Sequence, residues 1–245
     1  MARIISISNH KGGVGKTTMT ANLGFAFARQ FKVLLIDMDP QANLSMGLGY
    51  ADCDENIGSY IRDVIHFRNL NIRPKIINEY VHIIPGDFNL QKQETLLHET
   101  MRGEMLLEEI TKRLKSLYDL ILIDCPPAFN LLTINALKCS SLVLIPAKPE
   151  VFSIKGVDVV IKFANENNTP YKIIFNQVDR RTLFHKKVIE ESRKKYNSQL
   201  INHTVRNNIA LAETFSHAQD IFNYKNESIG AMDFVNLADE LVQYI

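Results

Sequence analysis

A glycine-rich segment near the start of the chain lies between an apolar stretch and a helical stretch. The apolar stretch covers residues 4–8, and the segment after it reads Asn9-His10-Lys11-Gly12-Gly13-Val14-Gly15-Lys16-Thr17-Thr18. A strand, a glycine-rich turn and a helix N-terminus in this order form a P-loop, whose backbone N–H groups and helix dipole bind phosphate. We therefore predict that the segment from Lys11 to Thr18 binds the phosphates of a nucleotide.

The predicted loop carries two lysines instead of one. Lys16 stands where a P-loop lysine reaches the β- and γ-phosphates, and Thr17 stands where a hydroxyl contacts Mg²⁺. The strict pattern has glycine at position 10, where this chain has His10, and the chain has a second lysine at Lys11. This is the deviant form of the Walker A motif. A glycine-rich turn that only closes a βα unit explains the two lysines poorly, so we expect ATP and Mg²⁺ as ligands.

Two other apolar stretches end in acids. Residues 33–37 end at Asp37 and lead into Asp39, and residues 120–124 end at Asp124 in a Walker B pattern. Ligands of open α/β folds bind at the carboxyl ends of the strands. One acid of the first pair is expected to orient the attacking water and the other to support the magnesium shell, while Asp124 is expected to hold Mg²⁺ through water. A turn at the Asp-Pro junction and a helix cap at Asp124 are the structural alternatives.

The alternation of strands and helices predicts the fold class. Short runs of Ile, Leu and Val alternate with amphipathic stretches, as in a doubly wound, mostly parallel α/β sheet with helices on both faces. The expected strands are 4–8, 33–37, 81–84, 120–124, 142–146 and 172–176; the expected helices are 17–29, 90–98, 104–117, 131–138, 155–165, 184–196 and 229–244. Residues 46–73 have weak periodicity and are predicted as a surface helix with loops. One domain over residues 1–245 is expected.

The composition excludes several classes of protein. The 28 Lys and Arg residues nearly balance the 27 Asp and Glu residues, so net charge gives no argument for nucleic acid or membrane. Cys53, Cys125 and Cys139 form no metal-ligand spacing, which fits free thiols in a reducing compartment. The N-terminus lacks a secretory pattern and no apolar run is long enough to cross a bilayer. We expect a cytoplasmic protein without a transmembrane segment.

Taken together, these motifs resemble the ParA/Soj family of partition ATPases, which is related to MinD and to the nitrogenase iron protein. The matches, in order along the chain, are 11–18, 34–41, 118–127, 135–137, 145–146 with Glu150 and Phe152-Ser153, and 228–231. They span nearly the whole chain. No helix-turn-helix segment precedes the loop, so the chain resembles the short form of the family.

The resemblance implies roles for single residues. Lys11 would reach across a nucleotide sandwich to the phosphates of a partner subunit, Asp39 would position the lytic water, and Asp124 with Thr17 would serve magnesium. Asn176 would hydrogen-bond adenine, and the backbone after Pro146 would line the base pocket. A strand-end turn is the other interpretation of Asn176.

The resemblance also implies a cycle. ATP binding would drive homodimerisation, and the dimer would bind double-stranded DNA without sequence preference, as a nucleoid-associated protein. A ParB-like activator at a centromere-like site would stimulate an otherwise slow hydrolysis. Two segments depart from the family pattern, Val205-Arg206 and Glu213-Thr214-Phe215-Ser216.

A basic stretch supplies the candidate DNA contacts. It contains Arg180, Arg181, Lys186, Lys187, Arg193, Lys194, Lys195 and Arg206. Such a local excess of positive charge is typical of a surface that binds phosphate backbones. A solvated helix face with pairs such as Glu190–Lys194 explains the pattern equally well. The residues leave both open, and the resemblance favours DNA.

Three other functions compete with DNA partition. A ParA-like ATPase that positions protein cargo would show the same motifs. A MinD-like membrane ATPase would need a basic amphipathic C-terminal helix, whereas residues 237–245 are acidic. A redox enzyme with a shared iron–sulfur cluster would use Cys125 and Cys139, for which buried thiols are the simpler interpretation.

Overall fold

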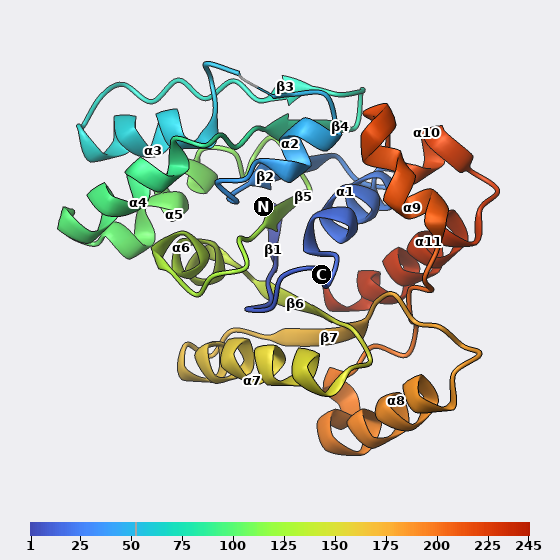
Figure 1. The fold of residues 1–245 in the computed structure, drawn as a ribbon. Coiled ribbons are helices and arrows are strands. Elements are labelled where there is room, and N and C mark those ends of the chain that lie inside the picture. The colour runs from blue at the N-terminus through green and yellow to red at the C-terminus, as the bar shows by residue number, and fades with distance from the viewer. Residues whose placement is uncertain (52) are drawn as a thin grey trace.

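A seven-stranded sheet forms the centre of the molecule, with the order β3-β4-β2-β5-β1-β6-β7 (Figure 1). The computed structural model describes residues 1–51 and 53–245, with the backbone alone for residues 151–155. The strands are β1 (Arg3–Ile7), β2 (Val33–Asp37), β3 (Lys75–Ile76), β4 (Val81–Ile84), β5 (Leu120–Asp124), β6 (Leu142–Ala147) and β7 (Tyr171–Phe175). All pairings are parallel except that of β3 with β4, so the sheet has one antiparallel edge.

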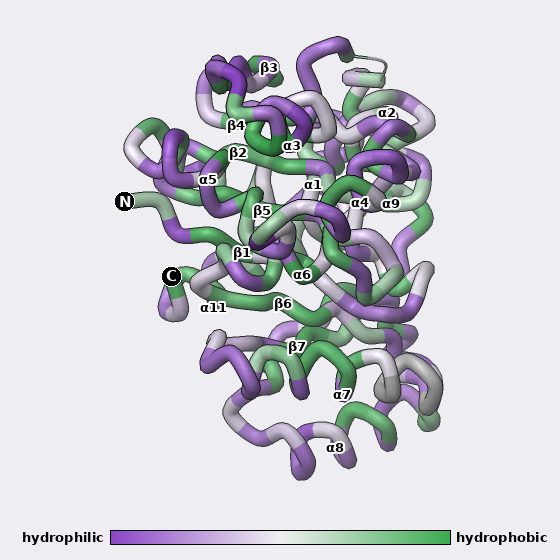
Figure 2. Tube along the Cα trace, turned by 90° about the vertical axis from the view of Figure 1, so that its left-hand side faces the viewer, coloured by the Kyte–Doolittle hydropathy of each residue, from purple (hydrophilic) through white to green (hydrophobic). Residues whose placement is uncertain are grey.

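Alternation along each strand sends side chains to two different cores. In β5, Leu120 and Leu122 join one hydrophobic cluster, while Ile121 and Ile123 join another on the opposite face. Every residue of β2, β5 and β6 is buried, as expected for parallel strands covered on both sides. Figure 2 shows hydrophobic strands in the interior and hydrophilic segments along the outer turns.

Helices cover both faces of the sheet. One face is covered by α1 (Lys16–Phe27), α2 (Asn43–Gly47), α9 (Ile209–Glu213), α10 (Ile221–Lys225) and α11 (Ile229–Leu241). The other face is covered by α3 (Ile57–Ile65), α4 (Leu90–Glu99), α5 (Leu106–Lys112), α6 (Leu131–Cys139) and α7 (Val151–Glu166), with α8 (Leu183–Tyr196) packed beside β7. Short 3₁₀ turns lie at Gly103–Met105, Asn197–Gln199, Thr214–His217 and Val242–Tyr244.

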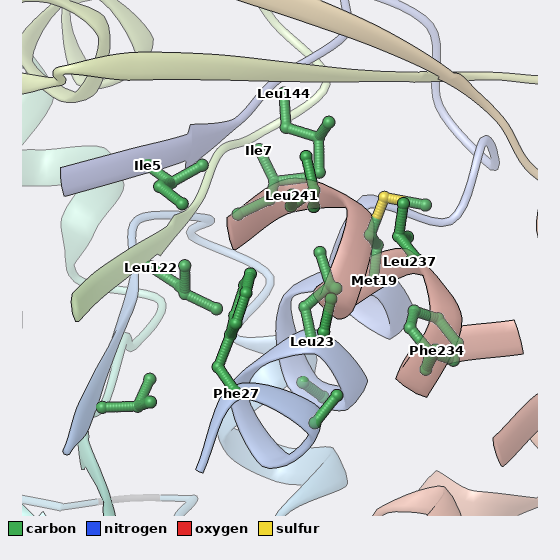
Figure 3. Close-up of a cluster of buried hydrophobic side chains, with 14 of the residues drawn as sticks. Ile5, Ile7, Met19, Leu23, Phe27, Leu122, Leu144, Phe234, Leu237 and Leu241 are labelled. Atoms are coloured by element: carbon green, nitrogen blue, oxygen red, sulfur yellow. The ribbon is translucent and has the colours of Figure 1, made fainter. Parts of the chain in front are cut away.

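The core beside α1 anchors the helix that begins at the P-loop. Met19, Leu23 and Phe27 of α1 pack against Phe234 of α11 and against strand residues such as Leu122 (Figure 3). Each of these side chains is almost fully removed from water. Burial of this kind stabilises by about 2 kcal/mol for each large apolar side chain. The start of α1 is therefore held in a fixed place at the end of β1.

The predicted fold class is confirmed, and the six expected strands are present with ends shifted by at most one residue. The two-residue strand β3 was not predicted. The expected helix at 104–117 was wrong in extent, because a 3₁₀ turn begins it and α5 ends at Lys112. Residues 46–73 contain the end of α2 and all of α3. The short helices α9 and α10 were not predicted either.

Candidate nucleotide site

The P-loop connects β1 to α1 and has the backbone that phosphate binding needs. Gly13 and Gly15 have φ values of 72° and 86°, which side chains rarely adopt. Gly15 is also closely approached by Asn176, whose amide a β-carbon on Gly15 would overlap. The Asn176 side chain donates to the carbonyl of Val14 at 2.8 Å. The end of β7 therefore braces the loop directly.

A second brace comes from the end of β6. The Asn9 side chain donates to the carbonyl of Pro146 at 2.7 Å and accepts from the backbone N–H of Lys11 at 2.9 Å. A β-carbon on Gly156 would overlap the Asn9 amide, so a glycine is required there in α7. Pro146 and Asn176 thus both lie beside the loop, where each takes part in a hydrogen bond that holds its shape.

The two lysines of the loop have different surroundings. Lys16 is only 6% exposed, and its ammonium lies 3.3 Å from the carbonyl of Lys11. Burial lowers the pKa of Lys16, and the charges of Asp124 and Asp39 oppose that shift. The Lys11 side chain is 34% exposed, and its ammonium forms an ion pair with Glu150 at 3.0 Å. Lys16 therefore points into the site, and Lys11 lies at its rim.

Two of the predicted carboxylates meet inside the protein. Asp37 and Asp124 are register partners on neighbouring strands, and both are fully buried. Burial raises the pKa of Asp37 to about 6, although hydrogen bonds from Ser45 oppose the shift. Burial, together with the charge of Asp37, raises the pKa of Asp124 well above its usual range. A cation near Asp124 would relieve this repulsion.

The free oxygen of the pair belongs to Asp124. Asp37 accepts hydrogen bonds from the Ser45 hydroxyl at 2.7 Å, the Ser45 N–H at 2.9 Å and the Asp39 N–H at 3.1 Å. Asp124 Oδ1 accepts from the Thr20 hydroxyl at 3.3 Å, but within the described chain its buried Oδ2 has no partner. Asp37, Asp124 and Thr17 were all expected to serve magnesium. Both Asp37 oxygens accept hydrogen bonds within the chain, whereas Asp124 keeps a free oxygen and has Thr17 close enough to lower its pKa.

A hollow of about 560 Å³ lies in front of the loop. It is lined by Gly12, Gly13, Gly15, Lys16, Thr17, Thr18, Asp39, Gln41, Asn43, Met46, Gly47, Pro127, Gln177 and Phe215. Asp39 is 6% exposed, and one of its oxygens accepts from the backbone of Gln41 at 2.9 Å. The structure thus brings Lys16, Thr17, Thr18 and Asp39 to one cavity, as the sequence predicted.

A smaller hollow of about 160 Å³ shares Thr18 and Gln177 with the first. Its other lining residues are Asn176, Arg206, Asn207, Asn208, Leu211 and Ala212. The Gln177 side chain donates to the carbonyl of Gly13 at 3.2 Å. Sequence reasoning missed Gln177, Asn208 and Leu211, because no motif contains them. The one available signal was that Gln177 directly follows the strand-end Asn176.

Most of the predicted basic stretch is engaged within the chain. Ion pairs join Arg181 to Asp179, Lys194 to Glu190, Lys195 to Asp158 and Arg206 to Asp233, and Arg193 donates to Asn202. Arg180, Lys186 and Lys187 are exposed. The Arg206 guanidinium is held by a fully buried carboxylate, and its role as a DNA contact stays a prediction. Lys186 and Lys187 have no ion-pair partner among the described residues, and their role as DNA contacts likewise stays a prediction.

The Arg206–Asp233 pair links the segment after β7 to α11. The Arg206 guanidinium and backbone N–H both donate to Asp233, at 2.6 to 3.1 Å, and His203 lies 3.5 Å away. Although burial alone would raise it, the nearby His203 ring and the hydrogen bonds from Arg206 lower the pKa of Asp233 to about 2. The ionised carboxylate thus holds one wall of the smaller hollow in place.

Replacement Asp233→Asn is expected to lower the free energy of unfolding at pH 7 by about 2 to 4 kcal/mol, because it leaves Arg206 without its charge partner. Since the folded pKa lies below the unfolded value, the stabilisation is present above about pH 4 and is lost as pH falls towards 2. Urea unfolding of both proteins at pH 7 and pH 3 measures this. Asp239→Asn, which loses only a half-exposed pair with Arg29, should change stability by less than about 0.5 kcal/mol.

Comparison with known proteins places the chain in a family. The model of a family described as an AAA domain matches residues 2–177. The sporulation initiation inhibitor protein Soj of Bacillus subtilis (strain 168) is 36% identical over 249 residues, which cover 98% of each protein. The chain belongs to the Soj/ParA family of partition ATPases. The chromosome partitioning protein ParA of Myxococcus xanthus (strain DK1622) is 34% identical to this Soj/ParA protein, with 99% of this chain and 89% of that one covered.

A solved structure agrees with this membership. The septum site-determining protein MinD from Pyrococcus horikoshii OT3, complexed with Mg-ADP, superposes with a TM-score of 0.81 at 28% identity, covering 98% of this chain and 96% of MinD. Among the described residues of this Soj/ParA protein, no helix is both long and apolar enough to cross a membrane.

The alternative functions find little support in the described residues. Cys125 and Cys139 are buried, and burial raises the pKa of both thiols, that of Cys139 to about 12. Both thiols are thus buried among core side chains, as expected for free cysteines that serve packing. Leu237, Ala238 and Leu241 of α11 pack in the core beside α1, so the apolar side chains at this end of the helix are buried within the protein. The Phe152-Ser153 match lies where no side chain is described.

Proposed function

We propose that this protein hydrolyses ATP with Mg²⁺, forms a homodimer around the nucleotide, and acts in DNA partition. The observation that carries the proposal is the different placement of the two loop lysines: Lys16 is buried towards the phosphate cradle, while Lys11 lies at the rim against Glu150. A buried lysine serves the chain's own nucleotide. A lysine at the rim can turn to the nucleotide of a second subunit.

Several residues at the cavity have proposed roles in this reaction. The N–H groups of the loop and Lys16 bind the phosphates, and Thr17 and Asp124 would hold Mg²⁺, Asp124 through water. Bound magnesium neutralises charge on the phosphates and draws electrons from the bond that breaks. The free Oδ2 of Asp124 and the MinD relative with Mg-ADP support this assignment. Asp39, which lines the cavity, orients the attacking water.

The base is proposed to enter the smaller hollow next to Thr18. Its lining offers the amides of Asn176, Gln177 and Asn208, with Leu211 as an apolar wall. Adenine needs polar groups for its ring edge and an apolar surface for its face. The Asn176 amide nitrogen donates to Val14, and its oxygen accepts from the Gln177 N–H at 2.9 Å, so the second lone pair of that oxygen is proposed to accept from the adenine amine.

The partition role rests on the named relatives and on exposed charge. Arg180, Lys186 and Lys187 on and before α8 are proposed to contact double-stranded DNA phosphates without reading sequence. A ParB-like activator is proposed to speed a slow basal hydrolysis, and the protein to act in the cytoplasm, nucleoid-associated in its ATP state. Positioning of protein cargo by the same switch is the second candidate, because the family includes relatives that are not named for DNA.

The first test is DNA binding by the purified protein on an arbitrary duplex, with no nucleotide, with ADP or with ATP. We expect binding with ATP only, and a loss of affinity as salt rises. Lys186→Ala/Lys187→Ala should weaken binding at least about 10-fold and reduce the salt slope by about 1 to 2. Fluorescence anisotropy at several salt concentrations gives both numbers.

The matched control is Lys112→Ala/Lys162→Ala, which removes two exposed lysines from α5 and α7. It should bind DNA within about 2-fold of the parent protein. ATP-dependent dimerisation without DNA binding at any salt concentration would reject the DNA role and favour protein cargo. Equal losses in both double variants would reject α8 as the contact surface.

A further inference from the structure

The short helix α2 follows Asp39 closely and forms part of the wall of the nucleotide cavity. A turn joins the two, in which the Ala42 N–H donates to the Asp39 carbonyl at 2.8 Å. Ala42 itself has a φ of 50°, in the left-handed region that few residues other than glycine adopt. Met46 and Gly47 of α2 line the same cavity as Asp39. The position of α2 therefore affects where the Asp39 carboxylate lies.

A helix as short as α2 needs contacts from other parts of the chain. It has five residues, which are too few for a helix that is stable by itself in water. Leu44 is fully buried in the core beside α1, and the Ser45 hydroxyl donates to Asp37 and accepts from the Gly86 N–H at 2.8 Å. These contacts hold the side of α2 that faces the sheet.

The aromatic ring of Phe215 packs against α2 beside the cavity. Phe215 belongs to the 3₁₀ turn Thr214–His217, and it lines the nucleotide cavity together with Gly47. A β-carbon on Gly47 would overlap three atoms of the Phe215 ring, Cγ, Cδ1 and Cδ2. The ring therefore lies directly on the Gly47 backbone, and a glycine is required at this position of α2.

The turn that carries Phe215 is itself anchored. Thr214 is fully buried, and its hydroxyl donates to the carbonyl of Leu211 at 3.0 Å. Its carbonyl accepts from the Gln219 N–H at 3.1 Å. Phe215 also packs against the core beside α1. The ring therefore gives α2 a fixed surface on the side of the cavity.

We propose that Phe215 is a positioning residue for ATP hydrolysis, which packs on Gly47 and so holds α2 and Asp39 in place beside the phosphate loop. The proposal rests on the proposed role of Asp39 in orienting the attacking water. A displacement of about 1 Å can slow a reaction about 100-fold. The Phe215 ring has no polar atom with which to bind phosphate or water, so it acts through α2. Its loss should therefore change the rate of hydrolysis more than the affinity for ATP.

The test is a double-mutant cycle on Gly47 and Phe215, with the single-turnover rate of ATP hydrolysis and the ATP affinity measured for each variant. Phe215→Ala should lower the rate at least about 10-fold and leave the affinity within about 3-fold. Gly47→Ala should lower the rate similarly, because the added methyl group displaces the ring, although alanine is the better helix former. The double variant should be no slower than Phe215→Ala, since no ring is left to displace. Additive losses would overturn the proposal.

Two further variants separate positioning from stability. Phe215→Leu keeps an apolar side chain next to Gly47 and should hydrolyse ATP within about 3-fold of the parent rate. Phe31 is also half-buried against the core beside α1, but it does not line the nucleotide cavity. Phe31→Ala should lower the melting temperature about as much as Phe215→Ala and leave the rate within about 2-fold. Equal losses of rate in the two alanine variants would mean that the rate follows stability, and the proposal would be wrong.

Hydrogen exchange without nucleotide reports on α2 independently of hydrolysis. The Met46 N–H, which donates to the Ala42 carbonyl at 2.8 Å, should exchange at least about 10-fold faster in Phe215→Ala than in the parent protein. Unchanged exchange at Met46 would reject Phe215 as the support of α2. Asp39→Ala tests the proposed function separately, because a variant that hydrolyses ATP at the parent rate would reject the role of Asp39 itself.

Discussion

Replacement Asp124→Asn is expected to stabilise the ligand-free protein and to abolish its hydrolysis of ATP. Asp124 is fully buried opposite Asp37, and its Oδ2 has no partner within the described residues. A neutral amide removes the cost of burying this charge and its repulsion with Asp37, and these two effects outweigh the attraction to Lys16 that is also lost. We expect a gain of about 1 to 3 kcal/mol in the free energy of unfolding without nucleotide.

Asp124→Asn should also remove the contribution that the carboxylate makes to the rate of ATP hydrolysis. Asparagine cannot provide the negative charge that would hold Mg²⁺ beside Thr17, so turnover should fall at least about 100-fold. Urea unfolding and steady-state phosphate release measure the two effects on one preparation. Added Mg-ATP should raise the melting temperature of the parent protein much more than that of the variant.

Ser45→Ala is the control for the expected gain in stability of Asp124→Asn. Ser45 also lies next to the acid pair, but it donates two hydrogen bonds to Asp37. Loss of its hydroxyl should lower stability by about 1 to 2 kcal/mol, since the buried Asp37 carboxylate loses a donor. If Asp124→Asn also lowers the stability of the free protein, the attraction between Asp124 and Lys16 outweighs the cost of burying the carboxylate, and Asp124 is not a strained metal site.

The sequence could assign the residues whose surroundings in the fold are formed by their own neighbours in the chain. The P-loop is one example, because a strand, a turn and a helix start determine the positions of Gly15 and Lys16 locally. Asp124 is another, since an apolar strand that ends in an acid must present it at the carboxyl edge of the sheet. These predictions needed only local geometry and the topology of a parallel sheet.

The contacts that sequence missed join distant parts of the chain. Arg206 looked like a free cation, but folding brings it to Asp233 on α11, and nothing near Arg206 in the chain signals this. Lys11 likewise meets Glu150, 139 residues away. Short elements such as β3 and α9 were missed for a related reason, since two to five residues form them only when tertiary packing stabilises them.

Substitution of Lys16 and substitution of Lys11 should have different effects on ATP binding. Lys16 is buried in the chain's own loop, whereas Lys11 is partly exposed and pairs with Glu150. Lys16→Ala should therefore weaken ATP binding by at least about 100-fold, because a buried charge opposite the phosphates is lost. Lys11→Ala should bind ATP within about 5-fold of the parent protein, since no phosphate of its own subunit depends on that side chain.

Although Lys11→Ala should still bind ATP, it should dimerise poorly. Light scattering of the parent protein with Mg-ATP is expected to detect a dimer, and Lys11→Ala should remain monomeric at concentrations about 10-fold higher, because no cation would reach the partner subunit's phosphates. Lys162→Ala, which removes an exposed lysine on α7, should dimerise normally. If Lys11→Ala loses ATP affinity as strongly as Lys16→Ala, Lys11 serves its own nucleotide, and the proposed exchange of lysines between subunits is wrong.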